Sequence, residues 1–340
     1  LSFPRKFCST LSVELEKSVF SHKPVLINEV INTFNSSSNK IAVDLTFGFG
    51  GHSKAILDTN KFVKVIGIDR DLSAYQSAIE ISRSNSHFTA IHAKFSELDK
   101  IFKENSVQEN TVDFILMDLG FSSCQMDNSE RGFSLSKNGK LDMRMDQNSN
   151  DLSAYDVINR LDAFELANIF KKYGEERFGR KIANMILEYR TSVGPISTTF
   201  ELAELVGKCV GWGHKYDALR RKSHPATQVF QALRIFVNDE LNELCSALTI
   251  AKRYLTPVTG RCAVISFHSL EDRLVKWAFN GRDFNGVDIS LTNLISDKTP
   301  RENYSWSQVG DIILPSTEEI NSNPRSRSAK MRIGKVENVL

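Results

Sequence analysis

Two acidic residues near the start of the chain flank a glycine-rich turn. Asp44 ends a short apolar run, Gly48 and Gly50 follow it, and Asp69 ends the next apolar run. Glycines let the backbone turn sharply and approach a ligand, and a helix that begins there offers free N–H groups. A carboxylate at the tip of the second strand can hold two ribose hydroxyls. The pattern therefore predicts a site for a dinucleotide or for S-adenosylmethionine.

Two residues favour S-adenosylmethionine at this turn. Ser53 stands where the dinucleotide pattern has its third glycine. Asp44 can engage the methionine part of S-adenosylmethionine, directly or through water. It can also serve only to cap the turn, and the sequence leaves both roles open.

A third acid, Asp118, ends the most apolar run and precedes Leu119. The carboxyl ends of parallel strands form the ligand crevice, so Asp118 is expected to point there. Methylation of an amino group on a base needs acceptors that localise the nitrogen lone pair and take up its proton. The Asp118 carboxylate and the Leu119 carbonyl are a candidate pair. Phe121 can stack the target base, or it can be a core residue.

Another candidate site residue, His268, follows the strand expected at Cys262–Ser266. Ser269 and Asp272 resemble a capping box for the next helix, which would account for part of this polar cluster. His268 can contact the base or its phosphate, or it can simply be packed.

The apolar runs predict the elements that position these residues. Strand and helix patterns alternate, which is typical of a parallel, doubly wound sheet in an α/β protein. The expected strands are Ile41–Val43, Val63–Ile68, Phe88–His92, Val112–Met117 and Cys262–Ser266, with a last one near Lys330–Val336; expected helices begin near His52 and cover Leu72–Ser82 and Leu270–Phe279.

Residues 125–223 are predicted to form an inserted helical subdomain, because helical patterns such as Ala163–Lys172 occur there without a buried strand. After it, His224-Pro225 opens an expected long helix whose apolar stripe would face the sheet. The stripe of this helix consists of Val229, Leu233, Phe236, Val237, Leu241, Leu244 and Leu248. The later residues 280–316 are expected to be irregular.

The composition is that of a globular protein. Hydrophobic residues make up 41% of the 340 residues, and no apolar run approaches the length of a membrane-spanning helix. The five cysteines are scattered and lack C-x-x-C spacing, which argues against a disulfide framework and a zinc knuckle. We expect neither a bound metal nor a membrane partner.

Residues 1–19, with Arg5 and Lys6 before the first acid, resemble the remnant of an organelle presequence or a disordered N-terminus.

The net charge is only +2, so a nucleic-acid partner would have to meet local basic clusters. Each cluster can also be a solvated surface without a partner. The candidates for contact with an RNA backbone are Arg177, Arg180 and Lys181, then Arg220, Arg221 and Lys222, then Arg325, Arg327 and Lys330.

Ten motifs, in order along the chain, resemble those of one family. They are Phe20–Val25, Asp44–Ser53, Gly67–Asp71, Asp118–Gln125, Glu130–Ser134, Leu141–Asp146, Tyr173–Phe178, His224–Asn238, Ser266–Arg273 and Asn323–Lys330. Together they resemble the RsmH (MraW) family, which N4-methylates a cytosine in small-subunit ribosomal RNA. The presequence-like start resembles the mitochondrial branch of that family.

The resemblance implies a Rossmann-like, class I S-adenosylmethionine-dependent methyltransferase. Its core would be residues 20–124 and 224–340, and its insertion would bind the substrate RNA. Two departures from the family pattern are Cys124, where proline is usual, and Gln228, where arginine is usual. Carried over to this sequence, the family's cofactor contacts fall on Gly50, Gly51, His52, Asp69, Phe95, Asp118 and Gln125.

The expected partner is small-subunit ribosomal RNA or an assembling small ribosomal subunit, together with assembly factors. The expected location is the mitochondrial matrix, or the cytoplasm of a bacterium-like host. Two other functions stay open: an amino-methyltransferase that acts on DNA, and a ribosome-assembly factor without turnover.

Overall fold

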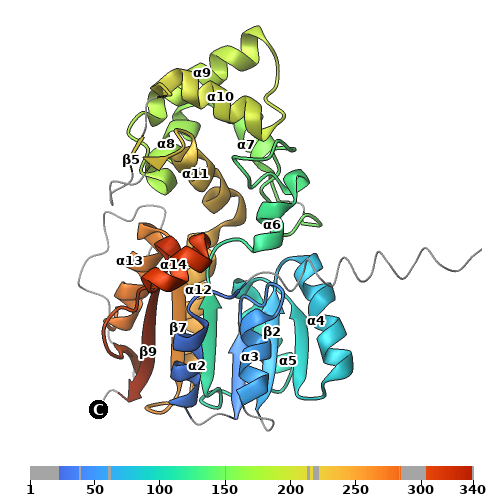
Figure 1. Ribbon diagram of the computed structural model, residues 1–340, viewed down its shortest axis with the longest axis vertical. Helices are drawn as coiled ribbons and strands as arrows, with labels where there is room; N and C mark the ends of the chain where they lie inside the picture. The colour runs from blue at the N-terminus through green and yellow to red at the C-terminus, as the bar shows by residue number, and fades with distance from the viewer. Residues whose placement is uncertain are drawn as a thin grey trace, which may run out of the picture. The chain divides into compact units, whose positions relative to one another are not determined.

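The chain folds into two units, one built on a sheet and one helical (Figure 1). The structure, a computed structural model, describes residues 23–37, 40–59, 63–149, 151–212, 215–216, 222–282, 284 and 304–338. Of the described residues, those in the ranges 23–120, 247–284 and 304–338 belong to the sheet unit, and those in the range 121–246 belong to the helical unit. Residues 1–19, with their predicted presequence remnant, lie outside the described residues.

A seven-stranded sheet forms the centre of the sheet unit, in the order β3-β2-β1-β4-β7-β9-β8. The strands from β3 to β7 are parallel, as predicted. All residues of β4 except the last are buried, which suits a strand covered on both faces. The bounds are β1 Ile41–Asp44, β2 Lys64–Asp69, β3 Phe88–His92, β4 Phe114–Asp118, β7 Arg261–Ser266, β8 Tyr304–Gln308 and β9 Lys330–Asn338.

The last two strands correct the expectation of a wholly parallel sheet. β9 pairs antiparallel with β7, and β8 pairs antiparallel with β9. β8 lies in a segment that was predicted to be irregular. The alternation of polar and apolar residues around Trp306, whose side chain is 4% exposed, was the signal that could have identified β8.

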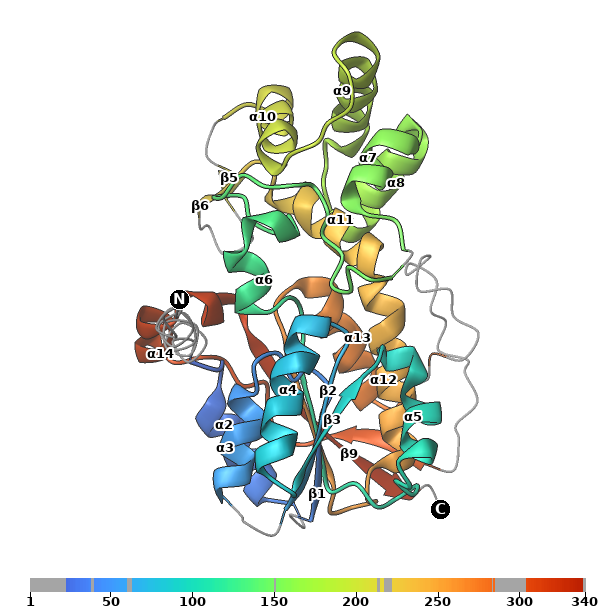
Figure 2. The same cartoon turned by 90° about the vertical axis from the view of Figure 1, so that its right-hand side faces the viewer.

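Helices cover both faces of this sheet (Figure 2). One face is covered by α2, α3 and α4, whose Phe34, Ile56 and Ala78 join strand residues in one apolar cluster. On the other face, Phe102 of α5 contacts Tyr254 edge-on, with ring centroids 4.7 Å apart. The bounds are α2 Ile27–Asn35, α3 Gly51–Thr59, α4 Leu72–Ser84, η1 Phe95–Glu97, α5 Leu98–Glu104, α13 Ser269–Phe279, α14 Thr317–Ser322 and η4 Pro324–Ser328.

The helical unit has a hydrophobic core of its own, centred on α8 and including Leu166, Phe170, Ile182 and Val229. A Cβ at Gly174 would lie 2.3 Å from the carbonyl oxygen of Gln228, so glycine lets α8 and α11 approach closely. The bounds are α6 Ser123–Asp127, η2 Ser129–Arg131, α7 Ala154–Arg160, α8 Ala163–Gly174, α9 Gly179–Ser192, α10 Thr199–Val210, β5 Lys215–Tyr216, β6 Lys222–Ser223 and α11 Thr227–Asn238. Within the described ranges, no helix has both the length and the apolar character to cross a membrane.

The predicted long helix is two helices, α11 and α12 (Glu240–Tyr254), so this expectation was wrong. The break occurs at Asp239, whose φ of 49° is left-handed. Asn238 anchors the end of α11, because its side chain donates to Met143 O at 2.7 Å and accepts from Met145 N at 2.7 Å. The stripe residues of α11 pack in the helical unit rather than on the sheet. The helical unit therefore extends to 246, beyond the predicted boundary at 223.

Candidate functional site

Three aspartates stand at the carboxyl ends of neighbouring strands. Asp44, Asp69 and Asp118 are the last residues of β1, β2 and β4. The chain runs outward from β1 to β2 and β3 and then returns to β4 on the other side of β1. Sheets of this kind bind ligands at such a switch point, outside the carboxyl ends of the strands. The structure thus brings together the three acids that the sequence singled out.

The glycine-rich turn joins β1 to α3. Gly48 and Gly50 have φ values of 56° and 79°, which residues with side chains rarely adopt. A Cβ at Gly50 would lie 2.7 Å from the Phe47 ring, and a Cβ at Gly51 would lie 2.4 Å from Pro24. The turn is packed closely from two sides, and its conformation requires glycine.

Asp69 fixes this turn from the neighbouring strand. Its Oδ2 accepts the N–H of Gly48 at 2.7 Å, and its Oδ1 accepts the N–H of Asp71 at 2.8 Å. Burial raises the pKa of Asp69 to about 6, although these two hydrogen bonds oppose the rise. Each carboxylate oxygen has a second lone pair, so a ligand hydroxyl can still donate to it. The contact between Asp69 and a ribose stays a prediction.

Asp44 points into the protein and is only 1% exposed. Its Oδ2 accepts the hydroxyl of Ser53 at 2.7 Å, and its Oδ1 accepts the N–H of Thr46 at 3.2 Å. Burial raises the pKa of Asp44, while His52 and these hydrogen bonds oppose the rise. The carboxylate therefore ties β1, the turn and α3 together, as a turn-capping residue does. Its contact with a cofactor stays a prediction.

Asp118 differs from the other two acids because one of its oxygens is unpaired. Its N–H donates to Thr46 Oγ1 at 2.6 Å, which fixes the backbone. Its Oδ1 is enclosed and has no hydrogen-bond partner among the described residues. Burial raises the pKa of Asp118 to about 6; Asp44 and Glu271 add to the rise, and His52 opposes it. A buried unpaired carboxylate oxygen is costly, so its position indicates a ligand group that donates to it.

His52 lies between Asp118 and the start of α2. It is the second residue of α3 and is 5% exposed. Its Nε2 lies 2.9 Å from Val25 O, and its Nδ1 lies 3.8 Å from Asp118 Oδ2. The side chain of His52 therefore belongs to the framework of the site.

These groups fit S-adenosylmethionine, which carries a sulfonium cation and an ammonium group. Negative charge at one edge of a sheet favours a cation over a neutral ligand. The second lone pairs of Asp69 are acceptors for the polar groups of such a ligand. The unpaired Oδ1 of Asp118 can accept either from the cofactor or from the amine that receives the methyl group. Asp69 and the turn at Gly48 and Gly50 are the parts that would hold the cofactor.

Two other predicted site residues follow strands of the sheet unit. Phe95 begins η1, three residues after the last residue of β3, and is half-buried. Leu119 follows Asp118, and its N–H donates to Ile265 O at 2.9 Å, so its peptide is fixed by β7. Neither position tests the predicted contact with the cofactor or the base.

Gln125 and Phe121 belong to the helical unit. Gln125 is 4% exposed and closes the cap of α6, since its Oε1 accepts the N–H of Ser122 at 2.8 Å. Phe121 stacks on Phe133, and the guanidinium of Arg234 lies 5.0 Å from its ring. This packing is that of a core residue, which was one of the two roles predicted for Phe121.

His268 caps α13, one residue before the predicted cap at Ser269. Its Nδ1 accepts the N–H of Glu271 at 3.4 Å, and Glu271 Oε2 accepts the N–H of Phe267 at 2.8 Å. The predicted partner, Asp272, instead contacts Arg332 Nε at 2.7 Å. The capping box was correct in kind and wrong by one residue, because a histidine nitrogen serves as the capping acceptor.

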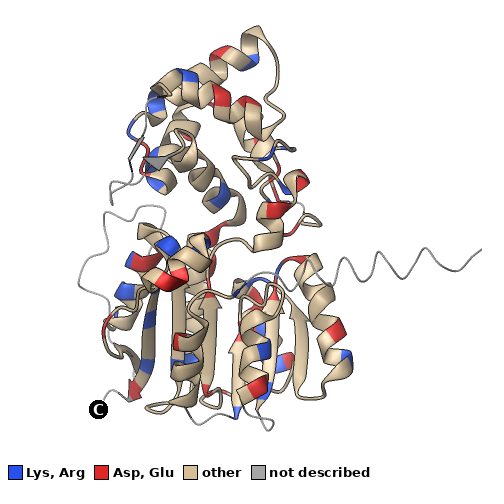
Figure 3. Ribbon diagram, viewed as in Figure 1, with Lys and Arg blue, Asp and Glu red and all other residues tan. Residues whose placement is uncertain are grey.

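The predicted RNA-binding residues fall in several places. Lysines and arginines are interspersed with acids in both units (Figure 3). Arg177 and Arg180 are exposed, whereas Lys181 donates to Cys209 O at 2.7 Å. Lys330 pairs with Asp272 at 3.4 Å, which reduces its free charge. Lys222 begins β6; Arg325 and Arg327 are exposed on η4; Arg220 and Arg221 lie outside the described residues.

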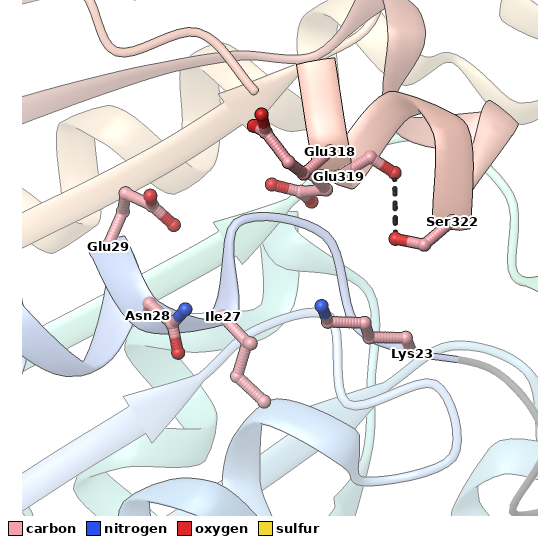
Figure 4. A pocket seen from close by; sticks show the side chains of 7 residues that line it. All are labelled: Lys23, Ile27, Asn28, Glu29, Glu318, Glu319 and Ser322. Carbon is pink, nitrogen blue, oxygen red and sulfur yellow. Dashed lines mark hydrogen bonds between the residues drawn. The ribbon is translucent and has the colours of Figure 1, made fainter. Parts of the chain in front are cut away.

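A pocket of about 300 Å³ lies between the start of α2 and α14 (Figure 4). Lys23, Asn28, Glu29, Glu318 and Glu319 line it, together with Ile27 and Ser322. None of these residues was predicted for the site, and none belongs to the strand ends. We place the chemistry at Asp118 because the unpaired oxygen lies there.

The residues that hold Asp44 and His52 in place were not predicted from the sequence. Thr46 and Ser53 bind Asp44, and Val25 binds His52 through a main-chain carbonyl. No sequence signal identifies a carbonyl partner. For Thr46 and Ser53, the signal available was their place within the glycine-rich turn.

Comparison with known proteins gives one family. A family model described as the MraW methylase family matches residues 19–337. A mouse protein named 12S rRNA N(4)-cytidine methyltransferase METTL15 is 40% identical over 350 residues, which cover 97% of this chain and 86% of the mouse protein. A protein of Methylobacterium nodulans named Ribosomal RNA small subunit methyltransferase H is 42% identical over 319 residues, covering 92% of this chain and 89% of that protein.

One relative has a name of another kind. A Culex quinquefasciatus protein named Putative receptor-type tyrosine-protein phosphatase mosPTP-1 is 42% identical over 324 residues. The match covers 92% of this chain but only 22% of that protein. Its name describes a much longer chain and gives no guide to the matched part.

Proposed function

Because the chain belongs to the MraW methylase family, we propose that it N4-methylates a cytosine of small-subunit ribosomal RNA with S-adenosylmethionine as the methyl donor. The unpaired Oδ1 of Asp118 at the switch point of the sheet carries this proposal. The names of the mouse and Methylobacterium relatives support the choice of RNA and base.

The chemistry divides between the donor and the chain. S-adenosylmethionine, when bound, supplies a methyl group activated by its sulfonium sulfur, which keeps the electron pair of the broken bond. The chain must hold the target nitrogen and accept the proton that this nitrogen loses. The Asp118 carboxylate accepts that proton, and the Leu119 carbonyl orients the amino group. The target cytosine must be single-stranded or flipped out of a helix to reach them.

A methyl-transfer assay tests the proposal. The purified chain is given methyl-labelled S-adenosylmethionine and either small-subunit RNA or DNA of equal sequence, and the product is analysed for N4-methylcytidine. We expect label in the RNA only, and no label with Asp118→Ala, whose fold is checked by circular dichroism. Label in the DNA alone would point to the DNA enzyme. Cofactor binding without any transfer, to naked RNA or to small subunits, would point to an assembly factor.

Two further proposals concern the form of the RNA substrate with its protein partners, and the location of this protein in the cell. We propose that the substrate is presented in an assembling small subunit with assembly factors, and that the protein works in the mitochondrial matrix. The presequence-like residues 1–19 support the proposed location. The exposed basic residues of η4 support the proposed RNA-containing substrate. Imaging of the tagged full-length protein and sedimentation with small-subunit precursors test the two statements separately.

A further inference from the structure

The hydroxyl of Thr46 joins the glycine-rich turn to the end of a neighbouring strand. Thr46 lies in this turn, two residues before Gly48. The main-chain hydrogen bonds that follow the pairing of β1 with β4 reach the N–H of Leu45, which donates to Leu116 O at 2.9 Å. Two residues further along the chain, the N–H of Asp118 donates to Thr46 Oγ1 at 2.6 Å. A side chain therefore supplies the acceptor at the point where the two strands end.

The orientation of this hydroxyl is fixed from β1. The N–H of Thr46 donates to Asp44 Oδ1 at 3.2 Å, and the hydroxyl hydrogen is directed at the same oxygen over a longer distance of 3.5 Å. An N–H group can only donate, so Oγ1 must accept from Asp118 through a lone pair. With its hydrogen directed at Asp44, the hydroxyl presents a lone pair to β4.

The backbone at the end of β4 is thereby held from both sides. On one side the N–H of Asp118 is bound by Thr46, and on the other side the N–H of Leu119 donates to Ile265 O of β7 at 2.9 Å. His52 also approaches Asp118, but its Nδ1 lies 3.8 Å from Oδ2, beyond hydrogen-bond distance. The Thr46 hydroxyl therefore fixes the peptide of Asp118 relative to the glycine-rich turn.

We propose that Thr46 is a positioning residue whose hydroxyl aligns the end of β4, which holds the target nitrogen, with the turn that holds the methyl donor. This inference rests on the proposed function. Transfer requires the two reacting atoms to lie about 3–3.5 Å apart with their orbitals aligned, and a misplacement of about 1 Å can cost about 10²-fold in rate. In this role Thr46 gives and takes no proton; it acts only through the position of Asp118.

Two variants that differ by one oxygen atom test this role in the methyl-transfer assay. Thr46→Ala removes the hydroxyl without adding an atom, and Thr46→Ser keeps the hydroxyl. We expect kcat to fall at least about tenfold in Thr46→Ala and to stay within about threefold of wild type in Thr46→Ser. The KM for S-adenosylmethionine should change by less than about threefold in both, because the contacts of Asp69 with the turn remain.

A threonine at the other end of the same strand is the matched control. The hydroxyl of Thr256 donates to Asp113 Oδ1 at 3.4 Å, just before β4 begins, so Thr256→Ala should keep the wild-type kcat. A wild-type kcat in Thr46→Ala, an equal loss in Thr46→Ser, or a loss that appears only in KM overturns the proposal. If Thr46→Ala does not fold, Thr46→Cys replaces it, because a thiol is a much weaker acceptor than a hydroxyl.

Amide hydrogen exchange of the full-length protein tests the hydrogen bond without any substrate. With ¹⁵N-labelled aspartate and leucine, we expect the Asp118 amide to exchange at least about tenfold faster in Thr46→Ala than in wild type. The Leu119 amide is the internal control, because Ile265 O still binds it. An unchanged rate at Asp118 overturns the proposal.

The two experiments also separate this inference from the proposed function. Faster exchange at Asp118 in a protein that methylates no RNA would remove the function, and the positioning role with it, while the hydrogen bond would stand. Methylation of RNA at the wild-type kcat by Thr46→Ala would leave the function and remove the positioning role.

Discussion

Asp118→Asn should make the protein more stable while it stops the reaction. Burial and the neighbouring acids hold the pKa of Asp118 at about 6, above the ordinary 3.8, so the folded state disfavours its charge. Asparagine has nearly the same shape and carries no charge. The substitution therefore removes the cost of the buried charge together with the proton acceptor.

The size of the gain in stability follows from the difference between the folded-state pKa of Asp118, about 6, and its ordinary pKa of 3.8. A difference of about 2 pH units corresponds to about 3 kcal/mol at most, and we expect a gain of about 1–3 kcal/mol at neutral pH. The sign depends on pH in a defined way. Because the folded-state pKa is the higher one, the cost appears as the pH rises through about 4 and is complete above about 6. The advantage of asparagine should therefore vanish near pH 4.

Urea unfolding followed by tryptophan fluorescence measures this gain. Trp306 is 4% exposed and lies in the sheet unit with Asp118, so its emission reports on the relevant part of the chain. Asp113→Asn is the matched control just before β4. Asp113 Oδ2 accepts the N–H groups of Lys40 and Ile41 at 3.0 Å each, and its loss of charge should lower stability by about 1–2 kcal/mol.

Two results would refute this reasoning about Asp118. A gain in stability that is equal at pH 7.5 and pH 4 would show that charge burial is not its source. Methyl transfer by Asp118→Asn at more than about a tenth of the wild-type rate would show that another group accepts the proton, since a lost general base costs about 10²-fold or more.

Three further predictions concern the turn, the cofactor and the RNA. Asp69→Asn leaves one acceptor oxygen for two backbone N–H groups, so calorimetry should find S-adenosylhomocysteine bound at least about tenfold more weakly; unchanged affinity would remove Asp69 from the site. Gly50→Ala should lower stability by about 2–3 kcal/mol and Gly48→Ala by about 1, because only the former also meets an aromatic ring; equal losses in urea melts would contradict this. Replacing Arg325 and Arg327 by glutamine should reduce the slope of log K against log salt for single-stranded RNA by about 1.4, and an unchanged slope would exclude them from the RNA contact.

The sequence predicted the sheet well where its strands are buried on both faces. β1, β3 and β4 were located to within two residues at each end, because a parallel strand under two layers of helices is a nearly continuous apolar run. β8 was missed because only Trp306 marks its buried face. The stripe of α11 was recognised but assigned to the wrong partner, since periodicity shows that a face is buried and not what covers it.

For the candidate site, the sequence by itself determined the types of residue and their places: a glycine turn after β1 and three aspartates at the ends of β1, β2 and β4. It could do so because strand ends and turns are local features of the chain. Only the tertiary structure decided what each acid does. Asp44 turns inward to Ser53, while Asp118 keeps an unpaired oxygen and faces His52. The position of His52 beside Asp118 depends on the Val25 carbonyl, in a segment whose Leu26 N–H is bound by Glu319 of α14. No local pattern records which distant groups will enclose a side chain.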